Sequence, residues 1–481
     1  MENEKCKMPS LTFCIFHFSF FILALIALER AMSKSQGDSS GNRIASIDAY
    51  RGFVMLAMAS SGFGFSALAK PENLQKLSEA RSNPFPEWLL TFLGYQFDHV
   101  AWTGCSFWDL IQPSFMFLVG VALPFSYSRR ASEGHSPAAQ FRHVLWRSFV
   151  LVALGVFLSS NGSKQTNFTF VNVLSQIGLG YPVLYLLRER TLRTQFAVAT
   201  IILSGYWAWF ANYTIPPTQF DDVKAALVER SPKLLQSHAQ PEMEWTQFTG
   251  YGSHWNKHVN AAAGVDRKIL NVLPSEKEKF RGKKFWVNEG GYQTLNFIPS
   301  LATMLMGLMA GTVLRSSQPD REKLKWLFLA GLACFCVSMP LDTSIWPIAI
   351  SKCDWHLAPI VKRIWTPGWA VFSSGWTFWM LAAFYWVIDI RQWRRWSWPL
   401  MIVGMNSIAM YVMAQLMKSW VGGAMKTHLT TIDALFGWKQ GISFVLFGEH
   451  PFATPLTHAA RLFGLWLICV WLYRRKIFVR V

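Results

Sequence analysis

The chain alternates between long apolar stretches and short polar ones. A helix needs about 20 mainly apolar residues to cross the ~30 Å hydrocarbon core of a bilayer. Ten stretches meet this requirement, and a further apolar run extends from Phe13 to Leu28. The pattern predicts an all-α, polytopic integral membrane bundle with about 10–11 transmembrane helices and one large extracytoplasmic loop. The ten predicted spans are residues 50–69, 106–127, 144–160, 170–187, 194–213, 296–314, 326–342, 368–390, 399–420 and 456–473.

Composition supports this prediction and limits the partners. The 481 residues are 52% hydrophobic and only 15% charged, with a formal net charge of +18. Soluble domains carry roughly 25% charged residues. A basic balance can indicate nucleic-acid binding, but then the charge should cover a polar domain surface. Here many basic residues lie in short clusters between apolar stretches, so we expect a lipid bilayer as partner and no nucleic acid.

The distribution of basic residues predicts the orientation of the helices. Five segments that flank the predicted spans hold 18 Lys and Arg in 49 residues, whereas the four short segments on the alternate side hold 9 in 107 residues. The long 214–295 segment is left out of this count because long domains are exempt from the charge rule. Because short cytoplasmic loops are enriched in Lys and Arg, the flank before residue 50 and the C-terminus are predicted to be cytoplasmic. Lys418 and Arg461 are exceptions, since they lie at the predicted outer ends of two helices. The expected location is a plasma membrane or a bacterial-type inner membrane.

The same pattern divides the chain into four parts. Residues 1–42 form an N-terminal segment with an extra apolar run, which is either a retained helix or precedes a start at Met32. Residues 43–213 form a first membrane helix group, and residues 296–481 form a second one. Between them, residues 214–295 are polar and of mixed charge, which predicts an extracytoplasmic loop subdomain.

The candidate chemistry lies where the first outer loop enters the next span. His99 is placed near the outer face, and Asp109 falls within the first turns of a predicted membrane helix. An ionisable group at membrane depth needs a partner or a wet cavity. Asp109 also completes a capping pattern with Ser106, so helix capping and a role in a site both remain open. A neutral imidazole such as His99 can accept a proton or an acyl group, whereas an interfacial histidine that only forms hydrogen bonds is the simpler alternative.

Four motifs resemble those of the transmembrane acyltransferase family typified by heparan-α-glucosaminide N-acetyltransferase. They occur in the family's order, between about residues 43 and 420. The matching segments are Ser46-Ile-Asp48-Ala-Tyr-Arg51-Gly52, His99-x-x-Trp102-x-Gly104 with Asp109-Leu-Ile-Gln-Pro113, Pro359-Ile-Val-Lys362-Arg363-Ile-Trp365-Thr366, and Gly404-Met405-Asn406-Ser407.

The resemblance implies an activity and its substrates. Such proteins move acetyl from acetyl-CoA, a co-substrate, to the glucosamine amine of a glycan on the far side of the membrane. His99 matches the family's active-site histidine, as general base or transient acyl carrier. No metal is expected, and a homodimer is compatible with the sequence.

Seven further residues are predicted to bind the sugar or the acyl-CoA. Lys362 and Arg363 could hold phosphates, and Arg51 could do so from the inner side, although snorkelling or a pair with Asp48 is the alternative. The predicted binding residues are Trp102, Asp109, Lys362, Arg363, Asn406, Arg51 and Asp48.

Two other functions fit the same pattern of spans. A secondary transporter for a sugar or cell-wall fragment would also place polar groups within a helical bundle. The two halves of the chain show no convincing internal repeat, and the loop at 214–295 has no counterpart. A membrane scaffold without activity is the weaker alternative. Stabilisation by acetyl-CoA would distinguish the acyltransferase from both.

Overall fold

The fold is built from helices, with one short pair of strands. β1 (Lys279–Phe280) pairs antiparallel with β2 (Lys283–Lys284), with Lys279 opposite Lys284. The computed structural model describes residues 44–79, 85–132, 136–230, 248–273, 279–280, 283–284, 286–288, 290–342, 356–448, 450 and 452–479.

The prediction of an all-α polytopic membrane protein is confirmed. Within the described residues, 6 helices are long and apolar enough to cross a membrane, or up to 8 if two bent helix pairs each form one span. The six helices are Trp108–Tyr127, Pro137–Ser159, Thr294–Arg315, Asp320–Leu341, Pro367–Ile390 and Ala453–Arg474.

The remaining predicted spans have different outcomes. α8 (Val173–Leu186) is an apolar helix of 14 residues, and α9 (Leu192–Ala211) has 20 residues. The predicted span at 399–420 is not one straight helix, because α16 and α17 meet at Asn406 with a bend of 72°. The apolar run Phe13–Leu28 lies outside the described residues.

The chain forms two compact units. Unit 1 combines residues 1–94 with residues 395–481, and unit 2 comprises residues 95–394. The His99 loop and the 356–366 segment both belong to unit 2.

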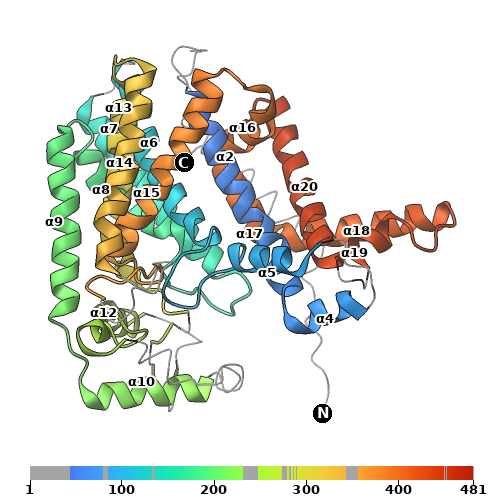
Figure 1. Cartoon of the computed structure of the whole chain (residues 1–481), viewed down its shortest axis with the longest axis horizontal. Helices are drawn as coiled ribbons and strands as arrows, with labels where there is room; N and C mark the ends of the chain where they lie inside the picture. The colour runs from blue at the N-terminus through green and yellow to red at the C-terminus, as the bar shows by residue number, and fades with distance from the viewer. Residues whose placement is uncertain are drawn as a thin grey trace. The chain divides into compact units, whose positions relative to one another are not determined.

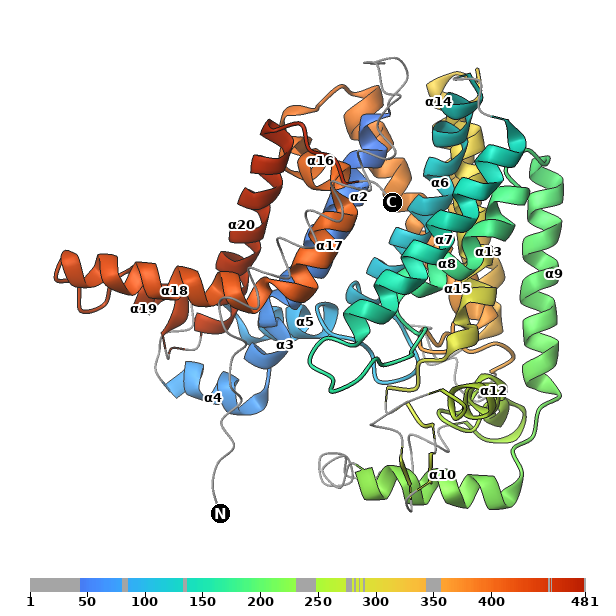
Figure 2. The ribbon, with the colours of Figure 1, turned by 180° about the vertical axis from the view of Figure 1, so that it is seen from behind.

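Unit 2 is a helical bundle centred on α13 (Phe297–Arg315), which is buried along most of its length. Its long helices run side by side in both views (Figures 1 and 2). α13 packs against α6, α8, α9 and α15. The other helices of the bundle are α6 (Ile111–Ser132), α7 (Pro137–Ser159), α8, α9, α14 (Asp320–Ser338) and α15 (Pro367–Phe384).

Small residues let the central helices of unit 2 approach closely. A side chain at Gly307 of α13 would collide with the backbone carbonyl of Phe117 on α6, and one at Gly311 would collide with that of Val121. Close contact at small residues is a common basis of helix association in membranes, where lipid removes the hydrophobic driving force. The α6–α13 contact therefore depends on glycine.

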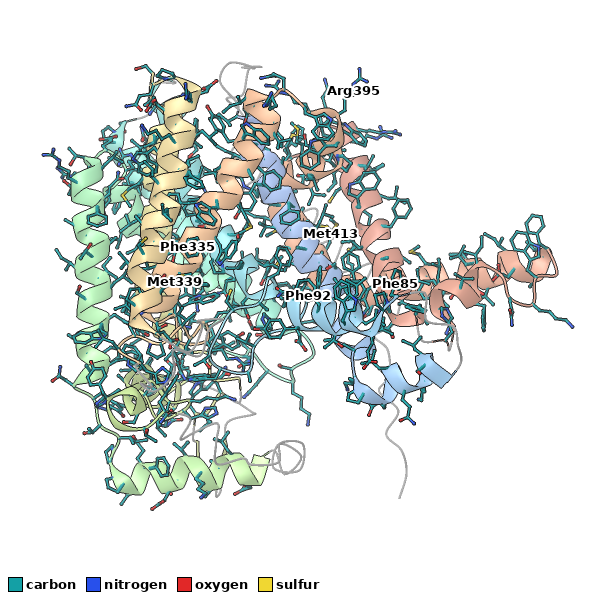
Figure 3. The ribbon with its side chains drawn as sticks, viewed as in Figure 1. Phe85, Phe92, Phe335, Met339, Arg395 and Met413 are labelled. Carbon is teal, nitrogen blue, oxygen red and sulfur yellow. The ribbon has the colours of Figure 1, made fainter. Side chains whose placement is uncertain are left out.

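Aromatic side chains join α14 to α15. Phe335, labelled in Figure 3, lies 5.5 Å from Phe372 and 4.8 Å from Trp379, measured between ring centroids. Both pairs are edge-to-face, which is a favourable aromatic geometry. A π-helical turn, η8 (Tyr385–Ile390), then ends α15.

The predicted external segment covers one end of the unit 2 bundle. α10 and α12 lie beside the end where α9 stops and α13 begins (Figure 2). Its elements are α10 (Pro217–Arg230), η4 (Gly250–Trp255), α12 (Ala261–Leu270), β1, β2 and η5 (Thr294–Asn296).

Unit 1 is organised around the contact between α2 (Ala45–Ser60) and α16 (Trp398–Met405). A side chain at Gly52 would collide with the carbonyl oxygen of Leu400, and one at Gly404 with that of Asp48. The glycines of the first and fourth motifs therefore form one helix contact. The other elements are η1 (Ser61–Gly64), α3 (Phe65–Leu68), α4 (Pro71–Glu79), α5 (Glu87–Gln96), η9 (Arg395–Ser397), α17 (Ser407–Leu416), α18 (Lys418–Leu435), α19 (Ile442–Phe447) and α20 (Ala453–Arg474).

Candidate active site

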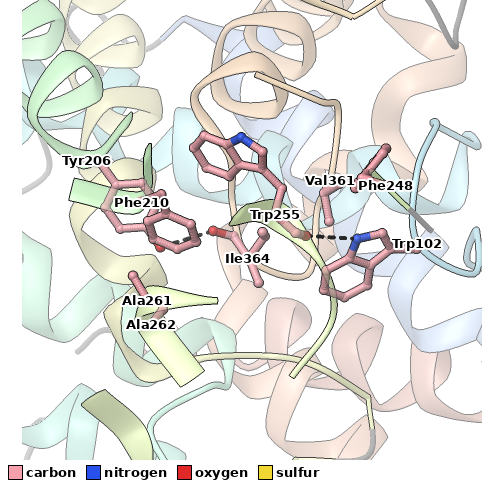
Figure 4. Close-up of a cluster of buried hydrophobic side chains, with 9 residues drawn as sticks. All are labelled: Trp102, Tyr206, Phe210, Phe248, Trp255, Ala261, Ala262, Val361 and Ile364. Carbon is pink, nitrogen blue, oxygen red and sulfur yellow. Dashed lines mark hydrogen bonds between the residues drawn. The ribbon is translucent and has the colours of Figure 1, made fainter. Parts of the chain in front are cut away.

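Hydrogen bonds at Trp102 and at Gly104 hold the loop that carries His99. Gly104 has a φ of +107°, and its N–H donates to the carbonyl of Ile360 at 3.0 Å. Trp102 is 2% exposed, and its indole N–H donates to the carbonyl of Trp255 at 3.2 Å (Figure 4). A buried indole with a satisfied N–H anchors a loop firmly, so this part of the His99 loop is held in place.

Asp109 caps the start of the following helix, as the sequence pattern predicts. It lies in the turn η2 (Trp108–Leu110), which leads into α6. Its N–H donates to Oγ of Ser106 at 3.3 Å, and its Oδ2 accepts the backbone N–H of Ser106 at 3.3 Å. These reciprocal bonds form a capping box. The cap uses Oδ2 and leaves Oδ1 for another partner.

That partner is His99. Its Nδ1 lies 2.7 Å from Oδ1 of Asp109, which is 1% exposed. The backbone N–H of Val100 also donates to Oδ2 at 3.2 Å. The carboxylate of Asp109 therefore caps a helix and orients an imidazole at the same time.

Lys362 supplies the positive charge that a buried carboxylate requires. Its Nζ lies 3.2 Å from Oδ1 of Asp109, and the Lys362 side chain is only 5% exposed. The same Nζ lies 3.2 Å from Nδ1 of His99. An ammonium can only donate hydrogen bonds, so the contact between Lys362 and Asp109 is the attractive one. The structure brings His99, Asp109 and Lys362 together.

This arrangement determines which ring nitrogen of His99 can react. With Asp109 ionised, Nδ1 carries the proton and donates it, so a neutral ring has its lone pair on Nε2. The His99 side chain is 39% exposed. Among the described residues, none bonds to Nε2. The group can therefore accept a proton or attack an electrophile from the open side.

The segment that presents Lys362 is irregular backbone held by buried polar groups. Oδ2 of Asp342 accepts the N–H of Ile360 at 2.7 Å, and the Tyr206 hydroxyl donates to the carbonyl of Ile364 at 3.2 Å (Figure 4). Backbone groups that are buried away from water need such internal partners. The 356–366 segment is thus rigid enough to place a lysine beside Asp109.

Asp342 forms a second histidine–aspartate pair, which the sequence did not predict. Its Oδ1 lies 3.0 Å from Nδ1 of His356, whose ring packs 4.7 Å from that of Phe248. The position of Asp342 at the end of a predicted span was the only signal available. Because Asp342 is fully buried, the pair serves to anchor the 356–366 segment.

Arg363 binds two backbone carbonyls instead of pointing into open space. One guanidinium nitrogen donates to the carbonyl of Gly290 at 2.8 Å, and the other donates to that of Val100 at 3.3 Å. The side-chain amide of Asn296 donates to the carbonyl of Arg363 at 2.8 Å. Arg363 therefore connects the 214–295 segment to the peptide next to His99.

Charged groups are also buried in the external segment. Asp266 is 1% exposed, and its Oδ2 accepts the N–H of Thr294 at 2.8 Å. Burial raises the pKa of Asp266 to about 7, although the bond from Thr294 and the charge of Arg267 act in the opposite direction. Burial, and then the charge of Asp109, likewise raise the pKa of the Cys105 thiol.

Three predicted site residues belong to unit 1, whereas His99 belongs to unit 2. Arg51 pairs with Asp48 at 3.4 Å. The side-chain amide of Asn406 donates to the carbonyl of Ile477 at 3.1 Å, and its oxygen accepts the N–H of Val479 at 2.9 Å. Asn406 thus joins the break between α16 and α17 to the C-terminal segment. Within the described residues, no three His, Cys, Asp or Glu side chains are grouped so that they could hold a metal ion.

Comparison with known proteins links this site to one family. The family model for "Heparan-alpha-glucosaminide N-acetyltransferase, catalytic" matches residues 87–223, which include His99 and Asp109. The chain is 22% identical over 475 residues to heparan-alpha-glucosaminide N-acetyltransferase of Mus musculus, covering 92% of this chain and 61% of the relative. It is 21% identical over 432 residues to the Homo sapiens protein of that name, covering 82% and 58%.

The matches cover different shares of this chain and of its relatives. The chain spans about three fifths of the length of these curated relatives, while the matched relatives cover most of this chain. The motifs, the matched family model and the two relatives agree, and this integral membrane protein resembles the transmembrane acyltransferase family typified by heparan-alpha-glucosaminide N-acetyltransferase.

Proposed function

We propose that the protein transfers an acetyl group from acetyl-CoA to the amino group of an extracytoplasmic sugar or glycan. The observation that carries the proposal is the bond between Nδ1 of His99 and the buried carboxylate of Asp109, 2.7 Å long. This bond orients the partly exposed ring of His99 and leaves its Nε2 available as a base or nucleophile. The names of the relatives support the reaction type.

In the general-base route, the amine attacks the carbonyl carbon of the thioester while Nε2 of His99 removes a proton from it. The C–N bond forms, the C–S bond breaks, and the proton passes from Nε2 to the departing sulfur to give the free thiol of CoA. Asp109 stabilises the transient imidazolium through the bond to Nδ1, as the aspartate does in histidine-based acyl transfer. Aligned general acid–base catalysis of this kind contributes about 10²- to 10⁴-fold.

In the acyl-carrier route, Nε2 itself attacks the thioester, the N–C bond forms as the C–S bond breaks, and CoA leaves as a thiolate. The amine then attacks the acetyl group on His99, the bond to Nε2 breaks, and the proton that the amine loses balances the thiolate as the free thiol of CoA. The two routes differ in one observable. Labelled acetyl-CoA without acceptor transfers its label to the protein only in the acyl-carrier route.

Lys362 and Asp109 have distinct roles in this proposal. The ammonium of Lys362, 3.2 Å from Oδ1, compensates the charge of the buried carboxylate. An isolated carboxylate in such a place would take up a proton, and a protonated Asp109 would no longer stabilise the imidazolium. Lys362 therefore acts through Asp109.

We assign Arg363 and Trp102 to positioning. Both side chains are already engaged with backbone carbonyls, Arg363 with Gly290 and Val100, and Trp102 with Trp255. This engagement favours a role in holding the His99 loop over direct binding of a phosphate or a sugar. Binding roles for Asp48, Arg51 and Asn406 remain predictions, testable by the KM for acetyl-CoA in their alanine variants.

The orientation is part of the proposal. The bias of basic residues places His99 on the extracytoplasmic side, where the sugar would arrive, and acetyl-CoA on the cytoplasmic side. A transfer across the bilayer would then have to bring the acetyl group to His99 from the opposite face.

The test uses purified protein with acetyl-CoA and glucosamine-type acceptors, in detergent and in proteoliposomes. We expect release of CoA that depends on the acceptor, and the acetylated amino sugar as product. Uptake of labelled sugar into vesicles without acetyl-CoA, in the absence of CoA release, would instead identify a transporter.

A further inference from the structure

Three basic side chains meet at one end of unit 1. Lys418, the first residue of α18, donates from Nζ to the hydroxyl of Ser61. His458 and Arg461 lie one turn apart near the start of α20. A Cβ at Gly64 would lie 3.3 Å from Cδ2 of His458, so the ring faces the η1 turn as well.

Arg461 closes the cluster from the other side. A side chain at Gly422 of α18 would collide with the guanidinium of Arg461. The absence of a side chain at Gly422 therefore lets Arg461 lie directly against the first turn of α18. Ser61 is exposed, so the cluster of Lys418, His458 and Arg461 opens to the surface beside it.

Among the described residues, the cluster has no carboxylate partner. Within the described part of the chain, no carboxylate forms an ion pair with Lys418, His458 or Arg461. Nδ1 of His458 and Nε of Arg461 are both buried and have no hydrogen-bond partner there. Buried polar groups are normally satisfied, and an unpaired buried donor costs free energy.

The local electrostatics agree with this geometry. Burial, and then the charge of Arg461, lower the pKa of Lys418 to about 8. Snorkelling would give a different picture, because snorkelling side chains extend their charged heads into water. The position is also unusual. Lys418 and Arg461 lie at helix ends that are predicted to be on the extracytoplasmic side, where basic residues are sparse.

We propose that Lys418, His458 and Arg461 form a binding site for a phosphate group, either that of a phospholipid headgroup or a soluble phosphate. A guanidinium and an ammonium offer charge-assisted donors to the oxygens of one phosphate, and a neutral imidazole can add an ordinary hydrogen bond. The location at the ends of α2 and α20, which are predicted to cross the membrane, is the level of the lipid headgroups. The site is independent of acetyl transfer, because its residues lie outside the His99 cluster.

The test compares a double variant with a matched control. Lys418→Gln/Arg461→Gln removes two cations from the cluster, whereas Lys426→Gln removes one from the exposed side of the same helix. Anionic phosphatidylglycerol in phosphatidylcholine nanodiscs tests the lipid source, and inorganic phosphate against chloride at equal ionic strength in detergent tests the soluble source. Retained lipid is measured by native mass spectrometry, and phosphate binding by thermal unfolding.

We expect the wild-type protein and Lys426→Gln to retain phosphatidylglycerol or to be stabilised by phosphate. The double variant should bind at least about tenfold more weakly. If the double variant fails to fold, Arg461→Lys replaces it in the test. This variant keeps the charge but loses the planar fork, so it should bind phosphate more weakly than the wild-type protein. Equal binding by all variants, or no response of the wild-type protein to either phosphate source, would overturn the proposal.

Discussion

At the scale of single residues, Asp109 is the group on which the site depends. One oxygen belongs to a helix cap with Ser106, and the other contacts both His99 and Lys362. A buried ion pair contributes little net stability, but the loss of one partner leaves an uncompensated buried charge. We therefore expect both activity and stability to respond to changes at Asp109.

Asp109→Asn should reduce the turnover number by about 10²- to 10⁴-fold, because a neutral amide cannot stabilise the imidazolium of His99. The rate of CoA release at saturating substrates measures this effect, with a monodisperse elution profile to show that the variant is folded. Asp98→Asn is the matched control, since the side chain of Asp98 accepts the backbone N–H of His99 at 2.8 Å and does not touch the imidazole nitrogen that contacts Asp109. A turnover number of Asp109→Asn within threefold of wild type would contradict the assigned role.

Asp266 should make the stability of the protein depend on pH. Its pKa of about 7 in the folded state lies above the value of ~3.9 expected in the unfolded chain. The folded state therefore binds more protons, and stability falls as pH rises from about 4 to about 7, then levels off. Thermal unfolding at pH 5, 6, 7 and 8 should show this slope in the wild-type protein and in the exposed control Asp221→Asn, and a flatter profile in Asp266→Asn. An unchanged slope in Asp266→Asn would assign the pH dependence to another group.

The sequence predicted part of this chemistry. The capping box of Ser106 and Asp109 follows from local spacing, and the structure contains it. The position of Lys362 does not follow from local spacing, because it lies 253 residues from Asp109 and meets it only through the fold of the 356–366 segment. From the sequence, only the family resemblance indicated that Lys362 and Asp109 belong to the same site.

At the scale of elements, Arg363 distinguishes two accounts of the 356–366 segment. If it positions the His99 loop through Val100 and Gly290, Arg363→Ala should lower kcat and leave the KM for acetyl-CoA nearly unchanged. If it binds CoA phosphates, as the sequence predicted, KM should rise and kcat should stay near wild type.

Arg363→Lys sharpens this comparison. Lysine keeps the charge but loses the planar fork that contacts two carbonyls, so it should also lower kcat under the positioning account. Steady-state kinetics over a range of acetyl-CoA concentrations provide both constants. If KM rises in Arg363→Ala but stays near the wild-type value in Arg363→Lys, the result would favour phosphate binding instead.

The contact between α2 and α16 should not tolerate a side chain. Gly404→Ala would place a methyl group against the backbone of Asp48, and such overpacking costs roughly 1–3 kcal/mol. Gly423→Ala is the matched control, because nothing lies within 4 Å of a Cβ at that helical position. Unfolding in detergent should show a lower midpoint for Gly404→Ala alone. Equal midpoints for the two variants would contradict the close approach of the helices.

Most spans could be predicted from hydropathy because each is a long apolar segment bounded by polar residues. The bend of 72° at Asn406 could not, since apolar residues continue on both sides of it. The hydrogen bonds of Asn406 to Ile477 and Val479 in the C-terminal segment could not be predicted either. Hydropathy does not report hydrogen bonds between distant segments.

At the scale of the whole molecule, the net charge of +18 is best explained by membrane topology. Basic residues concentrate in alternate loops, which orients the predicted spans and places His99 on the extracytoplasmic side in our proposal. The His99 cluster itself lies within unit 2. Acetyl transfer should therefore depend directly on residues of unit 2.

The most direct test of the central claim is the rate at which purified protein acetylates a glucosamine-type acceptor from acetyl-CoA. His99→Ala is compared with wild type and with His428→Ala, which removes an exposed histidine on α18. Our account predicts acetyl transfer by the wild-type protein and His428→Ala, and a loss of at least about 10²-fold in a folded His99→Ala protein. An unchanged rate in His99→Ala, or no acetyl transfer by the wild-type protein, would contradict it.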